Sequence, residues 1–135
     1  MLLLDSSVWI DIHRARTTSA TRYVETREDV EDIATAGIIY QEVLQGIRED
    51  AEYEYMRQVL SSTLILHPRE LSTYEIAAQL HRAARAAGFT IRKPNDCLIA
   101  ALALESGALL VHNDRDFFAL AQVEPALVIF PGRPH

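Results

Sequence analysis

The feature that most constrains the fold is a predicted helix that is apolar on every face. Residues 94–104 read Pro-Asn-Asp-Cys-Leu-Ile-Ala-Ala-Leu-Ala-Leu and carry no charge after Asp96. A helix without a polar face is buried between other layers of structure. Pro94 suits its first position, and Gly107 suits the residue just past its end. The chain is therefore expected to pack around this helix, with Asp96 at its N-terminal end.

Further aspartates follow two short apolar segments that are predicted to be buried strands. Residues 1–4 (Met-Leu-Leu-Leu) stop at Asp5, and residues 108–111 (Ala-Leu-Leu-Val) run through His-Asn to Asp114 and then Asp116. Each acid alone could serve as a helix cap or turn residue. In open α/β sheets, however, ligands bind at the carboxyl ends of the strands. Together with the acid that opens the buried helix, these residues are therefore expected to form a site.

Glu42 lies in the middle of an apolar helical stripe. In residues 38–47, helical numbering places three isoleucines and a valine on the face that also holds Glu42 and Gly46. Glutamate is rarely buried unless it is paired or bound to a ligand. Glycine is a poor helix former, so Gly46 suggests a close approach by a backbone or a bound group. A shifted register would instead leave Glu42 in solvent.

Crowded carboxylates repel one another, and a bound divalent cation would relieve that repulsion. An all-oxygen site at Asp5, Glu42, Asp96 and Asp114 suits Mg²⁺ or Mn²⁺. Zinc is disfavoured because Cys97 is the only cysteine and the histidines are scattered. Such an ion can polarise a phosphodiester and activate water. The chain has no phosphate-binding glycine loop and no G-x-S-x-G elbow, so metal chemistry is the best-supported activity.

The order and spacing of these motifs resemble the PIN domain. The matching motifs, between Leu2 and about Phe118, are Leu-Leu-Asp5-Ser-Ser, Glu42-x-x-x-Gly46, Asn95-Asp96-x-x-Ile99-Ala100-Ala101 and Asn113-Asp114-x-Asp116-Phe117. More narrowly, the length and layout resemble the VapC toxins of bacterial type II toxin–antitoxin pairs. The chain departs from the family pattern at His112, where Thr or Ser is more common. The fourth acid is either Asp114 or Asp116; we favour Asp114, with Asp116 as a structural partner.

The resemblance implies a three-layer α/β fold, with a mostly parallel sheet of four or five strands flanked by helices, in a single domain over residues 1–135. It implies an endoribonuclease dependent on Mg²⁺ or Mn²⁺, whose acidic residues are Asp5, Glu42, Asp96 and Asp114. It also implies an RNA substrate, a homodimer and a cognate VapB-type antitoxin whose tail blocks the active site. Two alternatives are a PIN-like nuclease of RNA processing outside a toxin pair, and a non-catalytic binding module with the same fold.

The rest of the chain agrees with this class of protein. Helical patterns at 50–60 and 72–87, with an apolar strand at 63–66 between them, predict an alternating, parallel α/β layer fold. The 49% of apolar residues among 135 suffice for the core of one domain. No apolar run approaches the roughly 18 residues of a membrane span, and the N-terminus lacks a signal-peptide pattern. With a single cysteine, the expected location is the cytoplasm.

The charge distribution bears on the partner. A net charge of −6 is unusual for a protein that binds nucleic acid. Residues 76–95, however, hold a basic strip with no acid, made up of His81, Arg82, Arg85, Arg92 and Lys93. This strip leads into the Asp96 helix and is expected to hold substrate phosphates, by backbone and shape recognition. Tyr53, Tyr55 and Met56, on an otherwise acidic helix, are candidate interface anchors.

Overall fold

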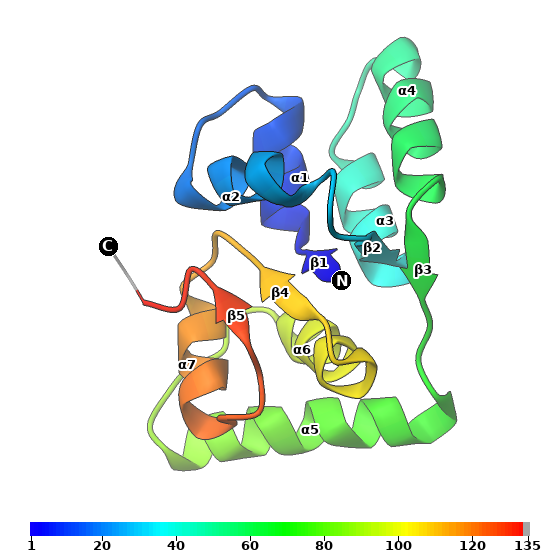
Figure 1. Cartoon of the computed structure of the whole chain (residues 1–135). Helices are drawn as coiled ribbons and strands as arrows, with labels where there is room; N and C mark the ends of the chain where they lie inside the picture. Colours follow the sequence, from blue (N-terminus) through cyan, green and yellow to red (C-terminus); the bar gives the residue numbers. More distant parts are fainter. Residues whose placement is uncertain (134–135) are drawn as a thin grey trace.

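A five-stranded parallel sheet forms the centre of the protein in the computed structural model, which describes residues 1–133 (Figure 1). The strand order is β3-β2-β1-β4-β5, so β1 is the central strand. The elements in chain order are β1 (Leu2–Leu4), α1 (Ser6–His13), α2 (Ser19–Arg27), β2 (Ile33–Ala36), α3 (Gly37–Gln45), α4 (Asp50–Ser61), β3 (Leu64–Leu66), α5 (Glu70–Ala86), α6 (Pro94–Ser106), β4 (Leu109–Val111), α7 (Asp116–Val123) and β5 (Ile129–Phe130). The predicted fold class is confirmed. Residues 134 and 135 of the predicted domain lie outside the described residues.

Helices cover both faces of the sheet. The helices α1 to α4 pack against one another on one side, and α5, α6 and α7 pack together on the other (Figure 1). The chain crosses from one face of the sheet to the other between β3 and β4. These two strands are separated in the sheet by β2 and β1, and α5 and α6 connect them. A parallel sheet needs such crossover helices, and they bury both of its faces. Among residues 1–133, no helix combines the length and apolar character needed to cross a membrane.

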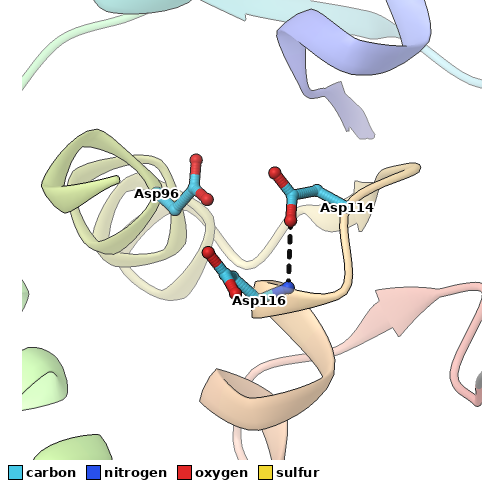
Figure 2. Close-up of side chains that lie close together, drawn as sticks. All are labelled: Asp96, Asp114 and Asp116. Carbon is cyan, nitrogen blue, oxygen red and sulfur yellow. Dashed lines mark hydrogen bonds between the residues drawn. The ribbon is translucent and has the colours of Figure 1, made fainter. Parts of the chain in front are cut away.

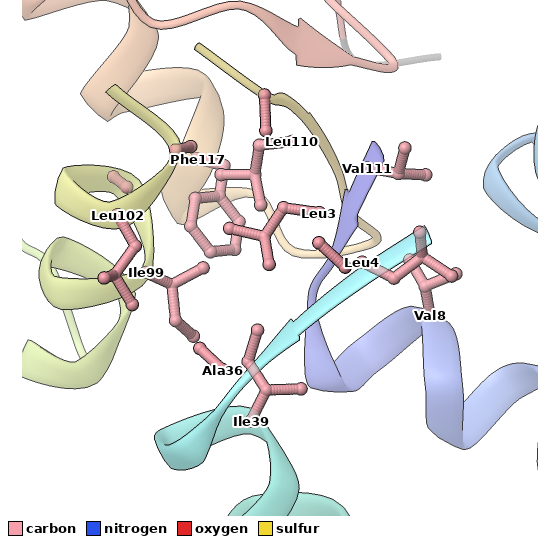
Figure 3. Close-up of a cluster of buried hydrophobic side chains, with 14 of the residues drawn as sticks. Leu3, Leu4, Val8, Ala36, Ile39, Ile99, Leu102, Leu110, Val111 and Phe117 are labelled. Carbon is pink, nitrogen blue, oxygen red and sulfur yellow. The ribbon is translucent and has the colours of Figure 1, made fainter. Parts of the chain in front are cut away.

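The apolar helix is α6, and it is buried as predicted. Ile99 to Ala103 are all buried, and Figure 3 shows Ile99 and Leu102 close to side chains of β1, β4 and α7. Pro94 occupies the first turn, and Gly107 ends the helix with φ of 71°. That left-handed conformation strains residues with a side chain, which explains the glycine. The core thus fixes α6 against the sheet and places its N-terminus near the strand ends.

Several sequence predictions were incomplete or wrong. The helix α2 and the strands β2 and β5 were not predicted, because β2 has two alanines and a threonine and β5 has only two residues. Met56 was expected to anchor an interface, but it is 3% exposed and belongs to the core. Tyr53 and Tyr55 are exposed on the same helix, α4. Met56 lies with Leu60, one turn further on, on the face of α4 that packs inward.

Candidate metal centre

Asp5 lies between the central strand β1 and α1, and only one of its two carboxylate oxygens accepts hydrogen bonds. Its Oδ2 accepts hydrogen bonds from the Ser7 backbone N–H (3.1 Å) and the Ser7 hydroxyl (2.5 Å). This is an N-cap, the local reason why a helix begins here. Its Oδ1 is buried and has no hydrogen-bond partner. Burial raises the pKa of Asp5, and the bonds from Ser7 offset this only in part.

Asp96 lies in the first turn of α6, where free backbone N–H groups favour a carboxylate. Its side chain is only 1% exposed, and its Oδ2 has no hydrogen-bond partner. Burial and then the nearby charge of Asp5 raise the pKa of Asp96 to about 8. A carboxyl group with so high a pKa is unfavourable in its charged form unless a cation lies beside it.

Three carboxylates converge where α6 meets the loop after β4. One oxygen each of Asp96, Asp114 and Asp116 lie within 4.8 Å of one another, and Figure 2 shows the side chains pointing toward a common centre. The Asp116 backbone N–H donates to Asp114 Oδ1 (3.0 Å), which fixes the start of α7 against the loop. Asp116, the alternative to Asp114 as fourth acid in the sequence, also belongs to this cluster. The signal was present in the sequence, as two acids two residues apart directly after a strand.

Buried His112 shapes the loop that carries Asp114. Its Nε2 donates to the Pro131 carbonyl (2.9 Å), and its Nδ1 accepts from the Asp114 backbone N–H (3.2 Å). Burial lowers the pKa of His112, so the ring is neutral and can both donate and accept. In addition, the Ser7 hydroxyl accepts from the Asn113 backbone N–H (3.0 Å). The loop is therefore tied to Asp5 through Ser7, and His112 provides main-chain support at a position where the family more often has a hydroxyl.

Two cations of the basic strip contact the cluster directly. Lys93 Nζ lies 2.8 Å from Asp114 Oδ2, and the Arg92 guanidinium lies 3.2 Å from Asp114 Oδ1 and 3.4 Å from Asp116 Oδ2. The Arg92 backbone N–H also donates to Asp116 Oδ2 (3.1 Å). Burial alone would raise the pKa of Asp114, but the hydrogen bond from Lys93 and the other donors outweigh it and lower that pKa. The sequence had assigned both cations to substrate phosphates.

Glu42 lies beside the cluster on α3. Ile39 and Val43 are buried on the same helix, so the predicted register is confirmed, and Glu42 is half-buried. The Ser6 hydroxyl donates to Glu42 Oε1 (3.2 Å). Burial and then the charge of Asp5 raise the pKa of Glu42. Asp5 and Glu42 are therefore coupled electrostatically, although both lie outside the group of three carboxylates.

Among residues 1–133, no second backbone comes close to Gly46. Gly46 ends α3 with an ordinary φ of −86°. A Cβ added there would meet only the Val43 carbonyl oxygen, at 3.7 Å. This is ordinary van der Waals contact within the same turn. The glycine therefore marks the end of the helix and not a place where a second backbone comes near.

The assembled site suits a hard divalent cation. Asp5 and Asp114 follow β1 and β4, which are neighbours in the sheet and lead to helices on opposite faces. This is the point at which open α/β sheets bind ligands. The donors are carboxylate oxygens, and Oδ1 of Asp5 and Oδ2 of Asp96 are buried without a partner. Buried polar atoms are normally satisfied, so these two oxygens fit a bound cation.

The PIN domain family model matches residues 2–123 of the chain. The chain belongs to the PIN-domain family. Ribonuclease VapC11 from Mycobacterium tuberculosis is 37% identical over 127 residues, which cover 91% of this chain and 93% of that protein. VapC ribonuclease Mb1587 from Mycobacterium bovis matches with the same identity and the same coverage. The predicted membership, including the likeness to VapC ribonucleases, is confirmed.

Solved structures share the fold. VapBC2 from Rickettsia felis, bound to a DNA fragment from its promoter, matches with a TM-score of 0.71 at 19% identity, over 95% of this chain and 96% of that chain. FitAcB from Neisseria gonorrhoeae matches with a TM-score of 0.67 at 21% identity, over 96% of each chain. Because these sequence identities are low, the two structures show only that the fold is shared.

Proposed function

We propose that this protein is a divalent-metal-dependent endoribonuclease that acts as the toxin of a type II toxin–antitoxin pair. The observation that carries the proposal is the pair of buried, unpartnered oxygens on Asp5 and Asp96, next to the converging carboxylates of Asp114 and Asp116. A stable fold gains nothing from such oxygens unless a cation satisfies them. The 37% identity to named ribonucleases supports RNA as the substrate.

In this proposal Asp5, Glu42, Asp96 and Asp114 hold a Mg²⁺ or Mn²⁺ ion. The ion would polarise the phosphodiester and lower the pKa of a bound water. Ser7 holds Asp5 in place, and Ser6 orients Glu42. Lys93 and Arg92 lie beside the carboxylates, where they can also stabilise negative charge on the phosphate.

The fourth ligand in this proposal is Asp114 and not Asp116. Oδ2 of Asp116 accepts the Arg92 backbone N–H and lies near the Arg92 side chain, so Asp116 ties the start of α7 to the segment before α6. Asp114 stands on the loop that Ser7 links to Asp5, which favours its role as a ligand beside Asp5. Asp116 then supports the site through its contacts with Arg92 and does not bind the ion.

The test is cleavage of RNA by purified protein with Mg²⁺, with Mn²⁺ or with a chelator. We expect cleavage only with a divalent ion, and none from Asp5→Asn or Asp96→Asn. These variants remove charge while keeping the shape of the side chain. Circular dichroism and thermal unfolding should show that both variants fold. Cleavage that persists in chelator, or in both variants, would contradict the proposal.

We also propose a VapB-type antitoxin partner, a homodimer and a cytoplasmic location. Support for the antitoxin comes from the solved structures of this fold, which include VapBC complexes. The homodimer follows from the likeness to VapC proteins, and the single cysteine favours the cytoplasm. Expression of the chain should arrest growth, and co-expression of the product of an adjacent gene should restore it. Growth arrest that no neighbouring gene relieves would favour the alternative, a PIN-like nuclease of RNA processing.

Light scattering measures the number of protomers, which should be two. If residues 1–135 are a single domain, the chain should unfold in one cooperative transition.

A further inference from the structure

The structure divides the basic strip into two groups with different surroundings. Arg92 and Lys93 contact the aspartates of the metal centre. His81, Arg82 and Arg85 instead lie on α5, and within residues 1–133 none of them forms an ion pair. The Arg82 side chain bonds to Gln79 (2.9 Å), and Arg85 lies 3.2 Å from His81 Nδ1. In this second group, the positive charges of Arg82 and Arg85 therefore remain available to a partner.

These three residues border a cavity of about 350 Å³ between α5 and the first turn of α6. We call it the α5–α6 pocket. Its remaining lining is apolar and consists of Ala77, Ala78, Pro94 and Cys97. Small and apolar side chains therefore share this lining with two arginines. An apolar surface beside positive charge complements a nucleotide, which has an apolar base face and an anionic phosphate.

The pocket lies next to the metal centre along α6. Pro94 and Cys97 line the pocket, and Asp96 of the carboxylate cluster stands between them in the same helical turn. Lys93, which lies 2.8 Å from Asp114, also directly precedes Pro94 of the pocket in the chain. A strand with one phosphate at the cluster that passes Lys93 therefore leads toward the pocket.

We propose that the α5–α6 pocket binds one nucleotide of the RNA strand, next to the phosphodiester that is cleaved. The base lies on the apolar part of the lining, and the phosphate is held by Arg82 and Arg85. The inference rests on the proposed function for the position of the strand. An acidic peptide would satisfy the arginines but would not need the apolar part of the lining, so the lining favours a nucleotide.

Binding of short single-stranded RNA to the full chain in EDTA tests the pocket without cleavage. The probes are a series of fluorescent oligonucleotides, each lacking the base at one position, measured by anisotropy. For wild type, removal of the base at one particular position should weaken binding about three- to ten-fold. Ala78→Leu fills the pocket and should bind the whole series equally weakly. Ala78 is exposed, so this variant is expected to fold.

The cations are tested separately by the salt dependence of binding. Replacing Arg82 and Arg85 together by Gln should weaken binding at least ten-fold at low salt. It should also reduce the slope of log K against log salt by about 0.7 per lost phosphate contact. Arg57→Gln is the control, because it removes an arginine from α4, where Arg57 pairs with Glu54. It should leave both quantities unchanged.

Two results would overturn the inference. The first is a wild-type protein that binds every oligonucleotide of the series equally. The second is a glutamate-rich peptide that binds as tightly as RNA, with neither ligand affected by Ala78→Leu; the surface would then serve an acidic protein partner. Neither result depends on catalysis. If the protein bound the series as expected but never cleaved RNA with Mg²⁺ or Mn²⁺, the proposed function would fail and the pocket would stand.

Discussion

Replacement of Asp96 by Asn should stabilise the protein without metal while it abolishes activity. The pKa of Asp96 is about 8 in the folded protein, against an ordinary value of 3.8. Below about pH 4 the proton is bound in both the folded and the unfolded states. As the pH rises to 8, the unfolded chain loses this proton first, so the folded state becomes progressively less favourable. Asp96 therefore lowers the free energy of unfolding between pH 4 and 8, and the loss is complete above pH 8.

The size of the effect follows from the shift in pKa. The difference between a pKa of about 8 and one of 3.8 corresponds to at most roughly 6 kcal/mol. Part of this free energy is shared between Asp96 and Asp5, because their charges interact. The N-terminus of α6 also stabilises the charged form of Asp96, by about 0.3 to 1 kcal/mol. We therefore expect Asp96→Asn to raise the free energy of unfolding by about 2 to 4 kcal/mol at pH 8. At roughly 3 °C per kcal/mol, the Tm rises by about 6 to 12 °C.

Urea and thermal unfolding in EDTA at pH 4.5 and pH 8 measure this difference. The stabilisation should be at most about 1 kcal/mol at pH 4.5, which lies just above the ordinary pKa of 3.8, and largest at pH 8. The control is Asp29→Asn, which removes an exposed carboxylate and should show no such trend. Excess Mn²⁺ should then raise the Tm of wild type but not that of Asp96→Asn. The reasoning is refuted if Asp96→Asn in EDTA is no more stable than wild type at pH 8, or gains equally at both pH values.

Three further predictions concern the residues around Asp96. Cleavage assays and Mn²⁺ titration should show loss of metal-dependent activity in Asp114→Asn, with Asp116→Asn less affected; the reverse order at unchanged stability would reassign the fourth ligand. Lys93→Gln should bind Mn²⁺ roughly five- to ten-fold more tightly in calorimetry, because Lys93 competes with the ion for Asp114. The control Arg57→Gln should show no change, and weaker Mn²⁺ binding by Lys93→Gln would contradict the competition. His112→Ala should lower the free energy of unfolding by about 2 to 4 kcal/mol in urea, since it removes a fully buried ring and two hydrogen bonds; a loss below 1 kcal/mol would mean that the loop does not depend on it.

The sequence determined those features that depend on local chemistry. The ends of α6 follow from Pro94 and from Gly107, and its burial follows from a run without charge. The start of α1 follows from Asp5, whose side chain caps the helix that it precedes. Caps and periodicity act within a few residues, so they can be recognised before any fold is known. The carboxyl ends of parallel strands lie at one edge of a sheet, and a helix that leads into the next strand begins at that edge. The meeting of Asp96 and Asp114 was therefore predictable as well.

Only the tertiary structure decided how distant segments pair at this edge. Arg92 and Lys93 were predicted to contact substrate phosphates, and the structure adds their ion pairs with Asp114, about twenty residues further along the chain. His112 looked like a departure from a hydroxyl pattern, but it holds the loop through Pro131. Such contacts are set by the order of strands in the sheet and by the layer on which each helix packs. No local pattern records them, because the same residues in another strand order would meet different partners.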